Sequence, residues 1–568
     1  MTVRTLDQRQ AAAPRAADHL LRNTSVLILL SLFLKGVYLL VFFYGFTELF
    51  SRLAAPWTRV TGTDGGWLRA VPYHGSSILA GSLANPIVAV TFAIFCVAPF
   101  LRMRHLRWAN LSNGVWLRWF GGGLALLLAW VLTSYDMNLY LGRAHYLDRV
   151  AVIALAVLTV WHPAFMAALL ASGFLVLSQF SYPMGDLSLT DAMPLFDTAL
   201  VLVGLVLVRC VSALWPRVRA TGGFDGAAFM LAVLTLHAAN YFAPAVEKVA
   251  ISPHLYEWML TNDVAMHTRA VLAWGWGPFA AAGPDVHGYL LDGAVLGRLP
   301  IQFGTMLLEG AGLFLLLRRR SSIGLLVIWC AFHAIIFMMS GILFWKWMLL
   351  NLGLAAVLWR ADPAMLGRLF TRAAFHFSLG AALALVAVSY LPIVGPQRLG
   401  WFDTPSFNTF RVEVVGASGR TYSVDDDDMT PYDHYFAFDR FFFLVPDKLV
   451  IRANASKDYA TADRVRRAGI DGIASLKQRE GRIYYDADRE QLLANFLTTY
   501  FRNLNAGMPK KTLLSYVQPP HHLVTSVPGE RYSRQEPVSR VRIRFTEYYF
   551  DGSAVRTVID KYVLDIGI

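Results

Sequence analysis

Charged residues are scarce in this sequence. Asp, Glu, Lys and Arg make up 16% of its 568 residues, whereas 56% are hydrophobic, and the mean hydropathy is +0.44. A surface that faces only water cannot accommodate so many apolar side chains. The scarcity of charge therefore excludes an ordinary water-soluble protein and predicts that much of the chain faces lipid.

Cysteine is also rare, and the usual catalytic motifs are missing. The three cysteines, Cys96, Cys210 and Cys330, all lie in apolar segments, so neither a disulfide framework nor a clustered thiolate site is available. The sequence contains no GxSxG, Walker A, HExxH or CxxC element. These absences give no support to hydrolase, nucleotide or zinc chemistry, and we predict no metal site.

What the sequence has in abundance is long apolar runs. Most are about 15 to 25 residues long with charges at their flanks, and a helix of that length crosses about 30 Å of hydrocarbon. The pattern predicts an α-helical polytopic membrane bundle with about ten or eleven hydrophobic helices, of which the two shortest could be buried or re-entrant. The candidate segments are Ser25–Phe46, Leu83–Leu101, Trp119–Tyr135, Arg149–Trp161, Ala164–Phe180, Leu195–Ala213, Phe224–Ala250, Thr305–Leu317, Ile323–Ser340, Ile342–Trp359 and Ala373–Ile393.

The net charge of +12 comes largely from arginines that gather in short connections between the apolar runs. With a cytoplasmic N-terminus, alternate threading of the runs places every dense arginine cluster on the cytoplasmic side, including those that contain Arg118, Arg209 and Arg318 to Arg320. The longer and less basic connections, such as Ile251–Pro300, then fall outside. We interpret the arginines as topology signals and expect no nucleic-acid partner. The prediction is a multi-pass integral membrane protein.

Three parts follow along the chain. Residues 1–24 are predicted to form a cytoplasmic tail and residues 25–395 a transmembrane domain. The apolar runs stop after Ile393, so residues 396–568 are predicted to form a separate domain. An odd number of crossings places this C-terminal domain on the extracytoplasmic side.

The C-terminal domain is predicted to be α+β or mostly β. Alternating polar and apolar residues over Thr409–Val424 indicate one hairpin, and Asp551-Gly552 turns a second one back into Val555–Ile566. Between them, Arg489–Asn503 has apolar residues at helical spacing, which predicts one packed helix. The acidic run Asp425–Asp428 lacks the spacing of a calcium loop and is interpreted as a solvated loop.

The most informative segment is the apolar span that holds His237, Asn240, Glu247 and Lys248. Ionisable groups at such depth are costly and usually face a polar cavity or a partner. Alternatively, Glu247 and Lys248 lie at the membrane interface, where Lys248 extends its amine toward the headgroups. Since Glu247 and Lys248 point about 100° apart on a helix, they need not pair with each other.

Three stretches resemble the vitamin K-dependent γ-glutamyl carboxylase family and its bacterial relatives with the HTTM membrane domain. The similarity extends over about residues 20 to 360. It rests on Tyr241-Phe242 with Glu247-Lys248-Val249 and a downstream Trp258, on Leu307–Leu317 with Arg318–Arg320, Ser322–Leu325 and Phe332-His333, and on His145-Tyr146-Leu147. The chain departs from the family pattern at Glu247, where a lysine pair is usual, and at Ala144 and Ile336, where asparagine is usual.

The resemblance implies a quinol-dependent carbon-carbon lyase in a bacterial inner or cell membrane. In that family a lysine deprotonates a reduced naphthoquinone, and oxygen then drives removal of a glutamate γ-proton so that carbon dioxide adds. The implied cofactor is vitamin K hydroquinone or another reduced quinone, and the implied partners are membrane lipids and an external protein or peptide substrate. The implied catalytic residues are Lys248, His145 and His333, and the implied quinol-binding residues are His237, Asn240, Tyr241, Trp258 and Phe344.

Two other classes of function stay open on the sequence. In a transporter, His237, Glu247, Lys248 and His333 would line a proton or solute pathway. In a membrane anchor, the bundle would only present the C-terminal domain to a binding partner.

Overall fold

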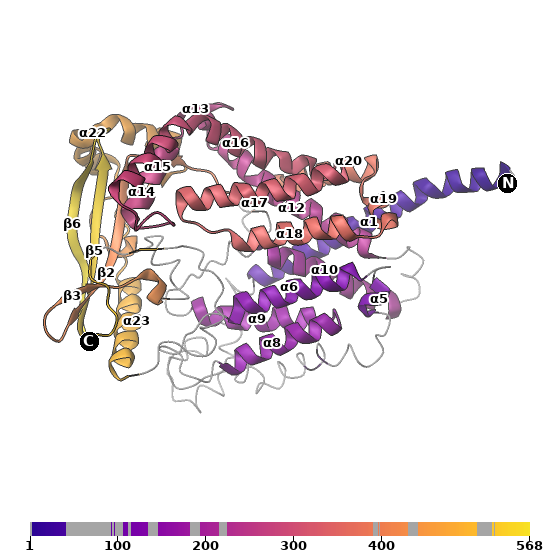
Figure 1. Ribbon diagram of the computed structural model, residues 1–568, viewed down its shortest axis with the longest axis horizontal. Helices are drawn as coiled ribbons and strands as arrows, with labels where there is room; N and C mark the ends of the chain where they lie inside the picture. Colours follow the sequence, from indigo (N-terminus) through magenta and orange to yellow (C-terminus); the bar gives the residue numbers. More distant parts are fainter. Residues whose placement is uncertain are drawn as a thin grey trace.

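A bundle of helices carries a sheet with two further helices at one end (Figure 1). This computed structural model describes residues 3–40, 93, 96, 106–111, 115–133, 146–181, 193–214, 224–389, 396, 398–429, 441–507, 525–526 and 529–568.

The helices of the bundle follow the predicted apolar segments closely. Of the segment Leu83–Leu101 only residues 93 and 96 are described, and each of the other segments contains a helix. The helices are α1 (Val3–Leu40), α5 (Trp108–Leu111), α6 (Trp116–Thr133), α8 (Tyr146–Trp161), α9 (Phe165–Ser181), α10 (Met193–Leu214), α12 (Gly226–Ala250), α16 (Arg298–Gly310), the 3-10 helix η5 (Ala311–Phe314), α17 (Arg319–Ser340), α18 (Trp345–Arg360), α19 (Pro363–Leu369) and α20 (Arg372–Val388).

Five of the described helices are long and apolar enough to cross a membrane. They are the Ala17–Val37 part of α1, then α6, the Met193–Ser212 part of α10, α12 and α17. Helices α18 and α19 together pass the same criteria but are bent by 115° at the break between them. The described part of the chain therefore holds five candidate membrane-spanning helices, whereas a membrane bundle with ten or eleven crossings stays a prediction.

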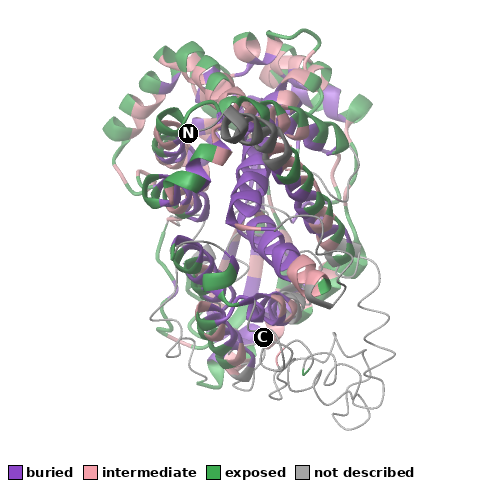
Figure 2. Cartoon of the chain, turned by 90° about the vertical axis from the view of Figure 1, so that its right-hand side faces the viewer, coloured by how far each residue is buried: buried purple, intermediate pink, exposed green. Residues whose placement is uncertain are grey.

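Helix α12 lies at the centre of the bundle. In the most apolar stretch of α12, 89% of the residues are buried, whereas in that of α17 only 28% are. Helix α12 is in contact with α1, α10, α16, η5 and α20. Asp225 accepts hydrogen bonds from the first free amides of α12 and pairs with Arg368 at 2.5 Å. Figure 2 shows the same arrangement, with buried residues inside the bundle and exposed ones around it. The polar side chains His237, Asn240 and Lys248 on α12 are therefore buried inside the protein.

Several arginines of the predicted clusters bind carbonyl groups at one end of the bundle. Arg118 donates to Val160 O at 3.2 Å and Arg209 to Asn110 O at 2.7 Å. Arg319 donates to the last turn of α18, and such cations stabilise the unpaired carbonyls of a helix C-terminus. Figure 1 shows α5 and α19 at the end of the bundle opposite to the sheet.

The connection Ile251–Pro300, which the sequence suggests is only an external loop, contains three helices. They are α13 (Glu257–Thr261), α14 (Val264–Trp274) and α15 (Pro284–Leu296). Asp263 caps α14 by accepting from Ala265 N, and a left-handed Gly275 (φ 79°) ends it. Helices α14 and α15 lie between the bundle and the sheet in Figure 1.

The C-terminal domain is an α+β domain. Its main sheet has the antiparallel order β3-β2-β5-β6, and β1 pairs with β4 in a smaller one. Both predicted hairpins are confirmed, because β2 pairs with β3 and β5 with β6 across the expected turns. The strands are β1 (Phe402–Asp403), β2 (Ser406–Gly416), β3 (Thr421–Ser423), β4 (Ala455–Ser456), β5 (Val538–Phe550) and β6 (Val555–Gly567).

Two long helices pack on this sheet where one was predicted. Helix α23 (Ala487–Asn505) confirms the predicted segment, whereas α22 (Tyr459–Glu480) was not predicted. Helix α22 is rich in charge and consists of two helical parts that meet at a kink at Gly469 (φ 63°), so its sequence lacks a clear helical period. The second helix decides between the two predicted classes in favour of α+β.

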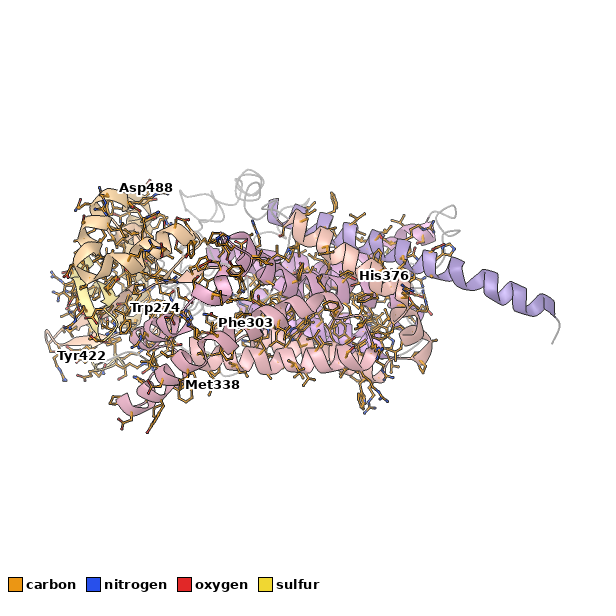
Figure 3. All side chains as sticks on the ribbon, turned by 90° about the horizontal axis from the view of Figure 1, so that it is seen from above. Trp274, Phe303, Met338, His376, Tyr422 and Asp488 are labelled. Carbon is orange, nitrogen blue, oxygen red and sulfur yellow. The ribbon has the colours of Figure 1, made fainter. Side chains whose placement is uncertain are left out.

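The sheet is docked on the helices that precede it. Trp274 Nε1 donates to Asn408 O at 2.8 Å, and Trp258 Nε1 donates to Trp401 O at 2.7 Å. The guanidinium of Arg269 lies 3.8 Å from the ring centre of Phe550. Figure 3 shows Trp274 on the side of the helices that faces the C-terminal domain. The C-terminal domain is therefore attached to the bundle by side chains as well as by the chain itself.

Candidate functional site

Three polar residues of α12 lie on one side of the helix. His237, Tyr241 and Lys248 are separated by four and seven positions, which brings them to the same face of an α-helix. Gly312 of η5 packs directly on this face, and an added Cβ there would lie 2.7 Å from Ala238 O and 3.2 Å from Tyr241 Cβ. Glycine therefore allows the α16–η5 segment to approach the polar residues closely.

Four buried side chains form a continuous chain of hydrogen bonds. His237 Nε2 lies 2.6 Å from Asn351 Oδ1, and Asn351 Nδ2 donates to the hydroxyl of Tyr241 at 2.8 Å. That hydroxyl lies 2.7 Å from His333 Nε2. The hydrogen-bond chain joins α12, α17 and α18, and its four residues are each at least 94% buried.

The orientation of the Asn351 amide sets the direction of this hydrogen-bond chain. Because Asn351 Nδ2 already donates to the hydroxyl oxygen, the hydroxyl donates to His333 Nε2. A neutral His333 then has its hydrogen on Nδ1. His333 Nδ1 is buried and has no hydrogen-bond partner among the described residues. In this orientation the hydrogen-bond chain ends at His333 Nδ1, a donor without an acceptor among the described residues.

Aromatic rings surround this end of the chain. Tyr241 stacks on Trp329 with ring centres 3.6 Å apart and planes 3° apart, and Trp347 meets Tyr241 edge-on at 5.2 Å. Phe344 lies 5.0 Å from the His333 ring. The indole Nε1 of Trp347 is a second buried donor without a partner in the described part of the chain. The surroundings of His333 therefore consist of aromatic rings together with two buried hydrogen-bond donors, His333 Nδ1 and Trp347 Nε1.

Lys248 lies farther along α12, in a buried ion pair. Its amine donates to both carboxylate oxygens of Glu309, at 2.7 and 2.8 Å, and to Leu399 O at 2.9 Å. The Trp258 ring lies 5.1 Å away. An ammonium group has three hydrogens, and all three have acceptors here. In its ammonium form, which these three acceptors suit, Lys248 has no lone pair with which to act as a base.

Glu247 points away from Lys248, as their spacing on the helix predicts. Its carboxylate lies 3.0 Å from Lys457 Nζ and 3.8 Å from Arg398, both in the C-terminal domain. Gly400 packs on the backbone here, where an added Cβ would lie 2.8 Å from Glu247 Cγ. The end of α12 is therefore held by the C-terminal domain, and Lys248 does not extend to the lipid headgroups.

A second buried ion pair crosses the bundle on another side of α12. Lys35 of α1 and Asp197 of α10 lie 2.9 Å apart with side chains only 8% exposed. Asn240 donates to Asp197 at 3.5 Å. Asn240, expected with the quinol-binding residues, thus contacts a different polar group from His237 and Tyr241.

The structure brings together only some of the expected site residues. His237, Tyr241, His333 and Phe344 lie in one cluster, Trp258 accompanies Lys248, and Asn240 accompanies Asp197. His145 lies outside the described residues. Sequence reasoning missed five residues that complete these clusters. They are Asn351, Trp329, Trp347, Glu309 and Asp197.

Two carboxylates of the acidic run, those of Asp425 and Asp428, are paired, in contrast to the solvated loop that the sequence predicts. Asp425 is only 3% exposed, and Arg531 pairs with both Asp425 and Asp428, at 2.9 and 3.2 Å. Thr525 also donates to Asp425 at 2.9 Å. Among the described residues no group of three or more His, Cys, Asp and Glu could hold a metal ion.

No family model, curated protein or solved structure matches this chain. The resemblance to the carboxylase family therefore rests on the quoted residues alone. A functional proposal has to be carried by the geometry of the bundle.

Proposed function

We propose that the bundle is a quinol-dependent membrane enzyme whose ligand binds at His333. The observation that carries this proposal is the unmatched Nδ1 donor of His333, at the aromatic end of a buried hydrogen-bond chain. A buried N–H without an acceptor costs about 1–3 kcal/mol, so a ligand oxygen that accepts from it is favoured. Aromatic side chains such as Phe344 and Trp347 suit a flat apolar ring. A quinone combines such a ring with acceptor oxygens.

The donors and acceptors of the hydrogen-bond chain can be arranged in either of two directions, depending on the orientation of the Asn351 amide. Rotation of the Asn351 amide by half a turn would present its nitrogen to His237 and its oxygen to the Tyr241 hydroxyl. Tyr241 would then donate to Asn351 and accept from His333 Nε2, which leaves His333 Nδ1 with a free lone pair. His333 would thus donate to a bound oxygen in one direction and accept its proton in the other. This property supports His333, in place of Lys248, as the proton acceptor.

When bound, a reduced quinone supplies two electrons and two protons to an oxidant such as oxygen. Following the family resemblance, we extend the proposal to carboxylation. Quinol oxidation by oxygen would then drive removal of a γ-proton from glutamate and addition of carbon dioxide. The substrate would be an external protein or peptide, presented at the end of the bundle that carries the C-terminal domain. The residues quoted for the resemblance support this step.

A transporter is the second candidate, and a specific observation favours it. The pairs Lys35–Asp197 and Lys248–Glu309 are buried between helices at two places in the bundle. Charged pairs at such depth commonly mark ion or proton pathways. A transporter requires no quinol, so quinol binding and turnover distinguish the two functions.

Binding of a reduced naphthoquinone to the purified protein in lipid nanodiscs tests the proposal. We expect saturable quenching of tryptophan fluorescence, because Trp347 lies beside His333. His333→Ala should weaken binding about tenfold, which corresponds to about 1.4 kcal/mol. His376→Ala is the matched control, since His376 is exposed and lies toward the other end of the bundle (Figure 3). Quenching that is absent, or equal in all three proteins, would contradict quinol binding at His333.

The same nanodiscs with labelled carbon dioxide, oxygen and a glutamate-rich peptide test the reaction. Label in the peptide would support carboxylation. Quinol consumption without label would restrict the proposal to quinol oxidation.

We also propose that the N-terminus is cytoplasmic and the C-terminal domain extracytoplasmic. The proposal is supported by the arginines that bind carbonyls at the end of the bundle opposite to the sheet, since basic residues are retained on the cytoplasmic side. A reporter enzyme that is active only in the cytoplasm, fused after Ile568, should be silent. An active reporter at this position would reverse the topology.

A further inference from the structure

Strand β6 forms one edge of the main sheet. In the order β3-β2-β5-β6 it pairs only with β5, so along its other side the backbone N–H and C=O groups of alternate residues have no strand partner in the described sheet. Edge strands of this kind are usually protected, and bulges are one means of protection. Here the pairing register shifts at Val558 and at Val563. From Leu564 to Gly567 the register is regular, so this last part of the edge is flat.

A groove follows the flat part of the edge. It has a volume of about 700 Å³ and is lined by Tyr562 to Gly567 on one side and by α23 on the other. Helix α23 contributes Glu490, Ala494, Thr498 and Arg502, which recur at intervals of four and so form one row along the helix. That row is about 18 Å long. Six residues of β6 cover about 17 Å, so the two walls match in length.

Helix α23 and β6 run in the same direction along the groove. Asn505, one turn after Arg502, exchanges two hydrogen bonds of 2.8 Å with the backbone of Val538. The amide of Ile568 donates to the neighbouring Ser539 O at 3.0 Å. Arg502 therefore lies toward the Gly567 end of the groove.

Some charged side chains of the groove form ion pairs and others do not. Asp565 is paired with Arg540 and Arg542, at 3.3 and 3.2 Å. Glu490 lies near Tyr485, and its carboxylate raises the pKa of the Tyr485 hydroxyl. Arg502 is exposed and forms no ion pair within the part of the chain that the structure describes. A ligand with one acidic group near the Gly567 end is therefore complementary to the groove.

We propose that this groove binds an extended peptide segment of a partner protein, about five residues long, as an additional strand antiparallel to β6. The unpaired backbone groups of Leu564 to Gly567 supply its main-chain hydrogen bonds. In the antiparallel direction the N-terminal end of the peptide lies at Gly567, so an acidic residue there meets Arg502. Strand addition of this kind fits one strand beside α23, because the helix wall closes the other side of the groove. The proposal does not depend on the quinol site.

Fluorescence polarisation with the full-length protein in detergent tests this binding. The probe is a labelled peptide of the sequence glutamate-valine-threonine-valine-threonine, blocked at both ends. A second probe carries N-methyl groups on alternate amides, which removes donors and leaves the side chains unchanged. We expect the first probe to bind and the methylated probe to bind about tenfold more weakly. Failure of the first probe to bind, or equal binding of both, would overturn the proposal.

Charge reversal locates the site. Arg502→Glu should weaken binding of the first probe about fivefold, and a probe with lysine in place of glutamate should recover it. Arg467→Glu on α22 is the matched control, because Arg467 is exposed and far from the groove residues in sequence. Equal effects of the two substitutions would place the peptide elsewhere and overturn the proposal. Edge-to-edge dimers that the peptide does not dissociate would assign the groove to a second copy of this chain instead.

Discussion

Replacement of Tyr241 with phenylalanine is expected to lower quinol turnover about a hundredfold without unfolding the protein. The hydroxyl of Tyr241 is the link between Asn351 and His333, at 2.8 and 2.7 Å. Without it the hydrogen-bond chain ends at Asn351, and His333 Nε2 has no group with which to exchange a proton. The phenyl ring keeps the stacking on Trp329, so the packing of the bundle should change little.

The measurement is the rate of quinol consumption in nanodiscs, together with quinone affinity from tryptophan quenching. We expect the affinity to change much less than the rate, because the lost group acts on the proton and not on the aromatic ring. Tyr289→Phe is the matched control, since the Tyr289 side chain is 78% exposed. A Tyr241→Phe protein with the turnover of the parent would remove the hydrogen-bond chain from the mechanism.

Lys248→Met is expected to lower the free energy of unfolding by about 3–5 kcal/mol, because it leaves the buried carboxylate of Glu309 without its partner. The pair is bidentate, and its side chains are 8% and 9% exposed. Glu309→Met should be similarly destabilising, because it isolates the ammonium group. The double variant should recover most of the loss, since two methionines fill similar space without a charge. Thermal unfolding in detergent measures each member of this cycle.

The double variant also separates structure from catalysis. If Lys248 serves only to hold α12 against α16, the double variant should keep quinol turnover. Loss of turnover in a double variant that is as stable as the parent would restore Lys248 as the catalytic base. Arg467→Met, which breaks the exposed pair with Asp463, should hardly change the unfolding temperature and serves as the control.

The bundle could be predicted from the sequence because each helix carries its own signal. A run such as Phe224–Ala250 is predominantly apolar, and its length alone indicates a membrane helix. The strands Val538–Phe550 and Val555–Gly567 were equally readable, since polar and apolar residues alternate around a strong turn. Helix α22 was missed because its charges and Gly469 hide its period. Local pattern thus predicts an element only where one face is uniformly apolar.

The candidate site was only half predictable, because it depends on contacts between helices. His237, Tyr241 and His333 were recognisable as polar groups in apolar spans. Asn351 carries the same signal within Trp345–Arg360 and could have been found from it. The pairing of Lys248 with Glu309 could not, since 61 residues separate them and the sequence does not state which faces meet. The sequence therefore suggests Lys248 as a base but does not show that its amine is paired with Glu309.

The pairing of β2 with β5 has a consequence for how the protein is made. Phe410 of β2 lies opposite Phe545 of β5, although most of the C-terminal domain separates them in sequence. Synthesis proceeds from the N-terminus, so β2 leaves the ribosome long before its partner strand β5 exists. Non-local pairing of this kind is slow and leaves edges exposed in the meantime. We therefore expect premature termination before Val538 to yield an insertion-competent bundle with an aggregation-prone tail, a product that cellular proteases would remove.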